Sequence, residues 1–147
     1  MEKEKKVLIK CRGIILDNGK LLAVKHPGYP ANLVALPGGH LEWGEDPKEC
    51  LSREIIEELG VKPEIGKLLY VNTFAHEDGR HYVEFFFEVT NGNEYHNLEK
   101  LTRSHAHEIT EIVWVNPSDN IIVLPRGFGE DFKRGKVISD EVRYIKD

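Results

Sequence analysis

Short apolar runs and alternating apolar and polar residues extend over much of the chain, which predicts a β-rich protein. Strands are expected at residues 7–16 and 20–25, because the Asp-Asn-Gly sequence at residues 17–19 favours a tight turn between them. After a loop rich in Pro and Gly, residues 33–37 are expected to form a further short strand. The first quarter of the chain is therefore interpreted as a hairpin followed by a third strand.

The second half of the chain carries the same kind of pattern. Residues 65–74 and 81–89 are rich in β-formers and are separated by a turn sequence at residues 77–80. A further strand is expected at residues 109–115, whereas residues 98–107 are polar and fit no single element. A short amphipathic helix is expected at residues 127–136, and the last residues of the chain are left without an assignment.

A period of 3.6 residues predicts a helix at residues 47–59. Asp46 is a suitable N-cap, Pro47 suits the first helical position, and Glu49 takes the capping-box position. Gly60 is expected to end the helix. The residues expected to face the core are Leu51, Ile55, Ile56 and Leu59.

Three glutamates of this helix are expected to share one face. Glu54, Glu57 and Glu58 project within an arc of roughly 100°. Two carboxylates about 5 Å apart repel each other by roughly 3 kcal/mol at an effective dielectric constant near 20. Only Lys48 and Arg53 are nearby cations in the sequence, so a divalent cation is expected to offset the repulsion. Oxygen-only ligands suit Mg²⁺, with Mn²⁺ as a substitute. The alternative interpretation is a solvated acidic helix face.

The residues before the helix are expected to let the backbone come close to a ligand. The apolar run that begins at Leu36 breaks into the glycine pair Gly38-Gly39, so a strand is expected to end there with its backbone free to approach a ligand. A loop at residues 40–45 then leads to the helix.

Read together, residues 39–61 resemble the Nudix box of the Nudix hydrolases: Gly, five residues, Glu, seven residues, Arg-Glu, apolar, any, Glu-Glu, any, Gly, apolar. The fixed positions are filled by Gly39, Glu45, Arg53, Glu54, Ile55, Glu57, Glu58, Gly60 and Val61. The resemblance implies an α/β/α sandwich with a central mixed β-sheet. It also implies hydrolysis of a nucleoside diphosphate that is linked to another group.

The resemblance also implies roles for individual residues. Glu57 and Glu58 would be metal ligands, and the carbonyl oxygen of Gly39 would complete part of the metal shell. Glu54 would be a further ligand or the base that activates the attacking water. Arg53 would orient these carboxylates by a bidentate pair rather than contact the substrate.

Members of the family often have one more acidic residue outside the box, a few residues before a strand with a tryptophan. Here Glu108 and Glu111 precede Trp114. Glu108 is the favoured metal ligand, since Glu111 could begin the strand and face solvent. Within the box, the resemblance implies that Glu45 supports the loop and the helix. Glu42 could be a further acid that supports the site, but it is interpreted as an ordinary loop glutamate.

Several residues outside the motif are candidates for substrate binding. Positively charged side chains could reach phosphate oxygens, although strand edges and turns also carry such charges on the surface. An aromatic side chain could stack on a base, although packing is its commoner role. The substrate-binding candidates are Arg12, Lys25, His40, Phe74 and Arg80.

Other reactive or aromatic residues receive weaker interpretations. Trp43 is a second stacking candidate with the same alternative of packing. His105 and His107 lie two residues apart, which allows a metal pair on one side of a strand. Cys11 and Cys50 fit neither a disulfide framework nor a zinc pattern, so both are expected to be reduced thiols, with Cys11 in the core.

Composition and charge restrict the class of protein. The 147 residues are 40% hydrophobic and 31% charged, which suits a single domain over residues 1–147. A net charge of −5 argues against binding to long nucleic acid, although a metal can neutralise a short phosphate chain locally. No apolar run reaches 18 residues, so no membrane segment is expected, and a cytoplasmic monomer or homodimer is the default.

Signatures of known Nudix subfamilies are absent after the box. A proline typical of ADP-ribose enzymes, a tyrosine typical of dinucleoside polyphosphate enzymes and the SQPWPFPxS array of NADH enzymes are all missing around residues 75–78. A nucleoside triphosphate, cleaved to monophosphate and pyrophosphate, is therefore the expected substrate. The alternatives are hydrolysis of ADP-ribose, a nucleotide sugar or a dinucleoside polyphosphate, a sensor that binds nucleotides without hydrolysis, and a plain metal- or partner-binding domain.

Overall fold

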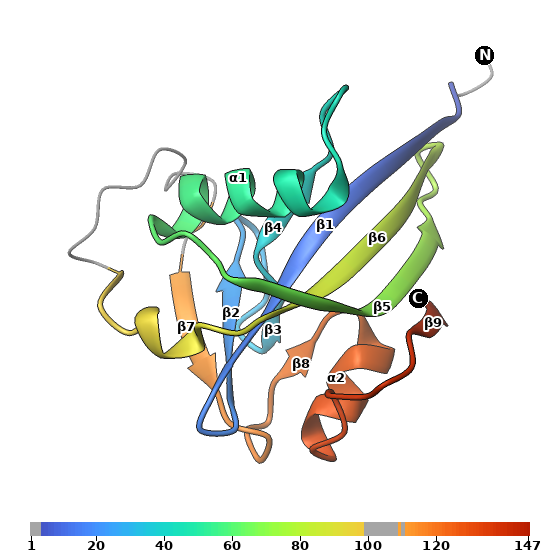
Figure 1. Cartoon of the computed structure of the whole chain (residues 1–147). Coiled ribbons are helices and arrows are strands. Elements are labelled where there is room, and N and C mark those ends of the chain that lie inside the picture. The colour runs from blue at the N-terminus through green and yellow to red at the C-terminus, as the bar shows by residue number, and fades with distance from the viewer. Residues whose placement is uncertain (1–3, 99–108, 110) are drawn as a thin grey trace.

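The computed structural model describes residues 4–98, 109 and 111–147, which form a curved β-sheet with two helices (Figure 1). The helices are α1 (Pro47–Leu59) and α2 (Arg126–Lys133), and a single 3₁₀ turn, η1, spans Gly92–Glu94. The strands are β1 (Lys6–Asp17), β2 (Lys20–Lys25), β3 (Leu33–Val34), β4 (Gly38–His40), β5 (Ile65–Ala75), β6 (Arg80–Val89), β7 (Glu111–Val115), β8 (Ile122–Val123) and β9 (Arg143–Lys146).

The main sheet has parallel and antiparallel pairs, as predicted for a mixed sheet. Its strand order is β7-β2-β1-β6-β5-β9, and β4 also pairs with β1. Strand β1 runs parallel to β6, β6 runs antiparallel to β5, and β5 runs parallel to β9. The short strands β3 and β8 form a separate parallel pair.

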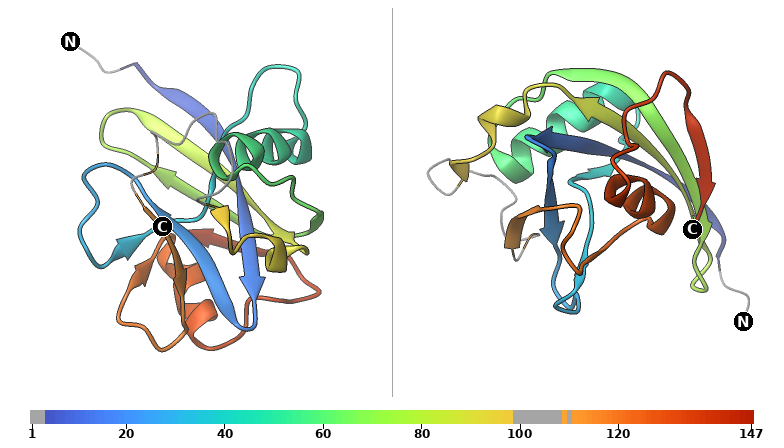
Figure 2. Two further views of the ribbon diagram at one scale, coloured as in Figure 1. Left: turned by 90° about the vertical axis from the view of Figure 1, so that its left-hand side faces the viewer. Right: turned by 90° about the horizontal axis from the view of Figure 1, so that it is seen from below.

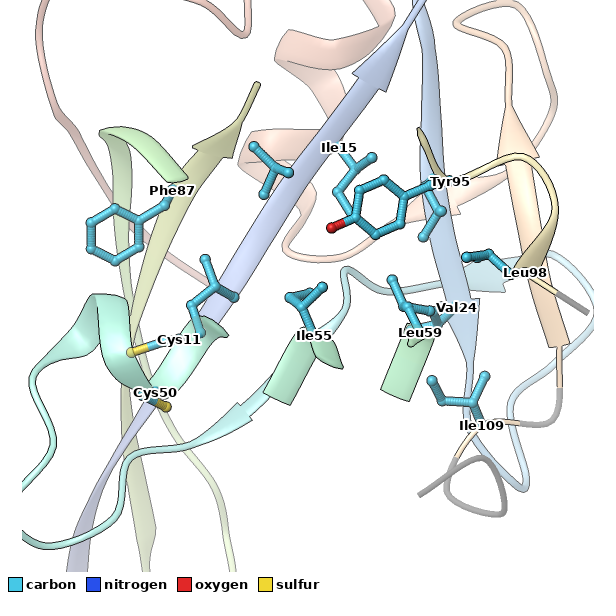
Figure 3. Packing of buried hydrophobic residues seen from close by; sticks show 13 residues of the cluster. Cys11, Ile15, Val24, Cys50, Ile55, Leu59, Phe87, Tyr95, Leu98 and Ile109 are labelled. Atoms are coloured by element: carbon cyan, nitrogen blue, oxygen red, sulfur yellow. The ribbon is translucent and has the colours of Figure 1, made fainter. Parts of the chain in front are cut away.

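The two helices cover opposite faces of the sheet, so the predicted α/β/α sandwich is confirmed (Figures 1 and 2). One hydrophobic cluster lies between α1 and the sheet and includes Leu51 and Ile55 of the helix. The second lies on the α2 side and includes Phe128 and Phe132. Figure 3 shows the α1-side cluster, in which both cysteine side chains are buried as free thiols.

The ends of α1 lie where the sequence predicts them. Asp46 is the N-cap, and its carboxylate accepts hydrogen bonds from the amides of Lys48 and Glu49 at 2.8 and 3.0 Å. Gly60 adopts a left-handed conformation with φ of 81°, and its amide donates to the carbonyl of Ile56. These local caps fix where the helix begins and ends.

Two predictions about the faces of α1 are wrong. Ile56 was expected in the core, but its side chain is 41% exposed, because it projects away from the face on which Leu51 and Ile55 are buried. Glu58 was expected on an outward acidic face, but only 2% of it is exposed. One glutamate of the acidic face is therefore buried at the edge of the core.

The glycine pair lies inside a strand rather than at the end of one. Gly38 and Gly39 belong to β4 and pair with Arg12 and Cys11 of β1. Gly38 has φ of 147°, and a Cβ built there would lie 2.0 Å from the carbonyl oxygen of Cys11, so no larger residue fits. The strand predicted at residues 33–37 is correspondingly shorter and ends at Val34.

The C-terminal part of the chain agrees with the predicted helix and adds a strand. The amphipathic segment predicted at residues 127–136 forms α2, and β9 follows it along the edge of β5. The predicted strand at residues 109–115 begins at Glu111. Residues 99–107 of the ambiguous polar segment lie outside the described residues. In the described part of the chain, no helix is long and apolar enough to span a membrane.

Candidate active site

A cavity of about 520 Å³ lies where α1, β4 and β1 meet. Its wall from α1 is acidic, whereas its wall from β1 and the β2–β3 loop carries basic and aromatic groups. The lining residues are Lys10, Arg12, His26, Tyr29, Gly38, Gly39, His40, Glu42, Arg53, Glu54, Glu57 and Glu58. The structure thus brings together the three glutamates predicted from the helix period with the glycine pair that precedes them.

Arg53 lies at the centre of the acidic wall. Its Nε and Nη2 donate to the two oxygens of Glu45 at 2.7 and 3.0 Å. Its Nη1 donates to Glu54 at 2.9 Å and to Glu57 at 3.3 Å, and Nη2 also donates to the carbonyl of His40 at 3.0 Å. The hydrogen bonds that Arg53 donates to Glu45 raise the pKa of Arg53, and the same contacts lower the pKa of Glu45. One guanidinium therefore fixes the positions of several carboxylates.

This arrangement corrects the argument from repulsion. The expectation is that a divalent cation offsets the repulsion among the three helix glutamates. Arg53 already supplies positive charge to Glu54 and Glu57, and its Nη1 also lies 3.7 Å from Glu42. Repulsion by itself therefore does not require a metal ion, and the case for one depends on the donor atoms.

Gly39 allows a close approach between β4 and the carboxylate of Glu54. A Cβ at this position would lie 2.3 Å from the carboxyl carbon of Glu54, so any side chain there would displace that carboxylate. The thiol of Cys50 lies 3.7 Å from the Gly39 carbonyl oxygen as a weak donor. The need for glycine at this position therefore comes from the contact between β4 and the carboxylate of α1.

The donor set fits a hard divalent cation. Glu54, Glu57, Glu58 and the carbonyl of Gly39 offer only oxygen atoms to one cavity, which is the preference of Mg²⁺ and Mn²⁺. Among residues 4–98, 109 and 111–147, no three His, Cys, Asp or Glu side chains are already grouped closely enough to hold a metal ion. Arg53 contacts one oxygen of Glu54 and one oxygen of Glu57, and a carboxylate has further acceptor positions with which it could bind a cation.

The predicted ligand outside the box is not among the described residues. Glu108 lies in the segment that the structure leaves undescribed, as do His105 and His107. Its alternative, Glu111, is exposed at the start of β7, where it pairs with Lys25 of β2. The contribution of either glutamate to the site stays a prediction.

The opposite wall of the cavity is cationic. Arg12 is nearly buried and pairs with Glu84 through its Nε at 2.9 Å, while its Nη1 donates to the carbonyl of Leu36 at 3.0 Å. Burial and the neighbouring Arg12 lower the pKa of Lys10 to about 8. Burial, with Lys10 nearby, also lowers the pKa of His40. Positive charge on Lys10 and His40 is thus costly here, and an anionic ligand would offset that cost.

The substrate-binding candidates divide into two groups. Arg12 and His40 line the cavity, and Phe74 lies beside a smaller adjoining one. Lys25 and Arg80 line neither cavity. The ammonium group of Lys25 donates to the carbonyl of Ala31, and Arg80 pairs with Asp78 of its own turn at 2.5 Å.

Trp43 is fully exposed in the loop before α1, so the alternative that it packs is wrong, and its role in stacking on a base stays a prediction.

Several cavity residues were missed in the sequence. Lys10 and Arg12 alternate on one strand, so both side chains lie on the same face of the sheet, and this pattern could have identified Lys10. Asn72 and Glu84 are polar residues within strands of largely apolar sequence, and both are buried. His26 and Tyr29 come from a loop, and nothing in their local sequence indicates that it folds over the cavity.

Comparison with known proteins supports the motif. The family model for the NUDIX domain matches residues 8–134. An ADP-ribose pyrophosphatase from Methanocaldococcus jannaschii is 33% identical over 122 residues, covering 71% of this chain and 72% of that protein. An RNA pyrophosphohydrolase from Acinetobacter baylyi is 44% identical over 54 residues, which is 35% of this chain and 31% of that protein.

Solved structures with the same fold point in the same direction. The crystal structure of a MutT NUDIX hydrolase from Burkholderia pseudomallei matches with a TM-score of 0.65 and 25% identity, covering 78% of this chain and 87% of that chain. The solution structure of the E. coli ORF135 protein matches with a TM-score of 0.67 and 24% identity, covering 88% of this chain and 91% of that chain. The second likeness is one of fold.

Proposed function

Since this chain belongs to the Nudix family of hydrolases, which act on phosphoanhydride bonds, we propose that it cleaves a nucleoside triphosphate to a monophosphate and pyrophosphate with a divalent cation. The proposed cation is Mg²⁺, with Mn²⁺ as a substitute, because the site offers oxygen donors only. The substrate is a small nucleotide rather than a long nucleic acid, in keeping with the net charge of −5.

One observation carries the proposal. The three glutamates of α1 and the cations Lys10 and Arg12 face the same cavity from opposite walls. A phosphate chain is a strong anion, so the cationic wall attracts it while the acidic wall holds the counter-ion that neutralises it. A solvated acidic helix face would have no reason to share a cavity with partly buried cations.

The chemistry requires a positioned water and a base. Glu57, Glu58 and the Gly39 carbonyl are the proposed metal ligands, and Glu54 is a further ligand or the base. Water attacks a phosphorus, its proton passes to a carboxylate, and the bond from that phosphorus to the bridging oxygen breaks. A bound divalent cation would stabilise charge on the phosphoryl oxygens and make a coordinated water more acidic. Arg53 positions the glutamates and does not itself react.

A second substrate class is favoured by one comparison. The relative from Methanocaldococcus jannaschii is named as an ADP-ribose pyrophosphatase. ADP-ribose also contains a diphosphate link, so the same site would accept it with another leaving group. A sensor without hydrolysis is disfavoured, because this chain keeps every glutamate of the motif.

A substrate panel tests the proposal. Purified protein with Mg²⁺ or Mn²⁺ is incubated with the nucleoside triphosphates, ADP-ribose, nucleotide sugars and dinucleoside polyphosphates, and the products are resolved by mass. We expect a nucleoside monophosphate and pyrophosphate from at least one triphosphate. If ADP-ribose is turned over faster than every triphosphate, ADP-ribose becomes the proposed substrate. If no compound of the panel is cleaved with either metal, the proposed activity is contradicted.

A further inference from the structure

Lys10 is a partly buried lysine whose amine lies at a cavity wall. It belongs to the middle of β1, and it lines both the cavity of the candidate active site and the smaller cavity of about 210 Å³ beside it. Its Nζ lies 4.6 Å from the centroid of the Tyr82 ring. The amine is therefore held against an aromatic ring at the boundary of two cavities, where a small molecule can reach it.

Lys10 has no paired carboxylate among the residues that the structure describes. Glu84 of β6 is its partner in the register of the sheet. The two oxygens of Glu84 accept hydrogen bonds from Arg12 at 2.9 Å and from Asn72 at 3.0 Å instead. No ion pair or side-chain hydrogen bond joins Lys10 to another described residue. The acid that would neutralise this lysine is thus engaged by other donors.

The surroundings of Lys10 favour the neutral form of its amine. The charged and titratable groups around it are Arg12 on its own strand, Arg80 and Glu84 on β6, His40 on β4 and Glu58 on α1. Burial and then Arg12 are the main causes that lower its pKa to about 8, against the opposite effect of the two glutamates. At pH 7.5 such an amine is roughly one quarter neutral, whereas an ordinary lysine is about one part in a thousand neutral. A desolvated lysine beside another cation is a typical nucleophile.

Arg12 supplies a place for an anionic group next to this amine. Lys10 and Arg12 alternate on β1, so their side chains lie on the same face of the sheet. The Nε and Nη1 of Arg12 donate to Glu84 and to the carbonyl of Leu36, which leaves Nη2 as its remaining donor group. A guanidinium is well suited to phosphate oxygens. A compound held here by a phosphate would place the atoms attached to that phosphate near the amine of Lys10.

We propose that Lys10 is a site of acylation by small acyl phosphates, the mixed anhydrides of a carboxylic acid and phosphoric acid. The neutral amine attacks the carbonyl carbon and forms a C–N bond. The bond from that carbon to the bridging oxygen breaks, and phosphate leaves with the electron pair. The nitrogen gives up one proton to solvent, so the step needs no oxidant or further reactant. The product amide carries no charge, so the wall that faces the glutamates of α1 loses one of its cations.

The rate of acetylation at each lysine tests the inference. The protein is incubated with acetyl phosphate at pH 7.5 in the presence of a chelator, so that no metal-dependent hydrolysis consumes the reagent. Peptide mass spectrometry follows the acetyl group on every lysine over time. Lys6 is the internal control, because it lies on the same strand, is 58% exposed and pairs with Glu4. We expect Lys10 to react about tenfold faster than Lys6 or more. A smaller ratio would overturn the inference.

A second reagent separates the phosphate from the reactivity of the amine. The succinimidyl ester of acetic acid transfers the same acetyl group but carries no phosphate. The ratio of the Lys10 rate to the Lys6 rate should be about threefold higher or more with acetyl phosphate than with this ester. Inorganic phosphate should slow the reaction of acetyl phosphate at Lys10 and leave Lys6 unaffected. Equal ratios for the two reagents, or no competition by phosphate, would contradict acyl phosphates as the reacting class.

Two variants locate the effect. Arg12→Gln removes the guanidinium that would hold the phosphate, so the Lys10 ratio for acetyl phosphate should fall to its value for the ester. Lys6→Arg removes the exposed lysine of the same strand, and the rate at Lys10 should stay unchanged. If Arg12→Gln does not fold, competition by phosphate in the wild type still decides the role of the anion site. No step of this test needs hydrolysis, so its outcome does not depend on the proposed function.

Discussion

Arg53 and Glu45 are joined at two points, with Nε 2.7 Å from one carboxylate oxygen and Nη2 3.0 Å from the other. The pair links the loop before α1 to the middle of that helix, and it leaves Nη1 of Arg53 directed at Glu54 and Glu57. The orientation of the helix glutamates therefore depends on a residue in the preceding loop.

The two-point geometry predicts that Arg53→Lys is not a conservative change. A lysine keeps the charge but cannot make the parallel contacts to Glu45 while also reaching Glu54. We expect kcat to fall by about 10- to 100-fold, as for the loss of groups that orient metal ligands. Steady-state kinetics at saturating metal measure this effect. An unchanged kcat, with the fold intact by circular dichroism, would show that Arg53 does not position the glutamates.

The contact between Gly39 and Glu54 predicts a severe effect of one methyl group. In Gly39→Ala the new Cβ would lie 2.3 Å from the carboxyl carbon of Glu54, so the carboxylate must move. Displacement of a reacting group by about 1 Å can lower turnover by on the order of 100-fold.

Gly66→Ala on β5 is the matched control, because its Cβ would meet the methyl group of Thr90 at 3.2 Å and the side chain of Glu88 at 3.5 Å, with no contact under 3.0 Å. Turnover and thermal stability are measured for both variants, so that a loss of turnover can be separated from a loss of stability. If the two substitutions reduce turnover equally, the contact between Gly39 and Glu54 has no special role.

The lowered pKa of Lys10 predicts a pH dependence. Burial lowers this pKa from 10.5 to about 8 in the folded protein, so the ammonium is charged below pH 8 and loses its proton above it. We expect the KM for an anionic substrate to rise as the pH passes about 8, and Lys10→Met should abolish that rise. Measurements of KM from pH 6 to 10 on both proteins test this prediction. If KM depends on pH in the same way in both proteins, the prediction is contradicted.

The same pKa has a consequence for stability. Between pH 8 and 10.5 the unfolded chain binds the proton and the folded chain does not, so the free energy of unfolding should rise with pH over this range. The contribution of Lys10 is the difference in the free energy of unfolding between the wild type and Lys10→Met, measured by urea titrations across this pH range. A difference that falls with pH would have the wrong sign.

The two isoleucines of α1 are predicted to contribute unequally to stability. Ile55 is fully buried, so Ile55→Ala should cost about 2–5 kcal/mol through lost burial and a cavity. Ile56 is 41% exposed, and Ile56→Ala should cost under about 1 kcal/mol. Urea unfolding of the two variants measures the difference. Equal losses would mean that the helix is rotated relative to the observed packing.

Local signals in the sequence were sufficient to predict α1 and the glutamates on it. Asp46 and Gly60 fix the ends of the helix, and its period fixes which glutamates share a face. The burial of Glu58 could not be predicted in this way, because it depends on how deeply the helix lies against the sheet.

Features that depend on distant parts of the chain were missed. Strand β9 is only four residues long and exists through its pairing with β5. The contact of Asn72 with Glu84 requires the register of β5 on β6, which no local pattern gives. The pairing of Glu45 with Arg53 spans a loop and two turns of helix, so the motif spacing implied a support without giving its contacts.

The most direct test of the proposed activity is the dependence of turnover on Mg²⁺ in the wild type and in Glu57→Gln. The substitution keeps the shape of the side chain and removes the charge that would bind the cation. Glu130→Gln, an exposed glutamate of α2, is the control. We predict saturable Mg²⁺ activation in the wild type and in the control, and at least a 100-fold lower rate in a folded Glu57→Gln protein. Equal Mg²⁺-dependent rates in all three proteins would contradict the role assigned to the acidic face of α1.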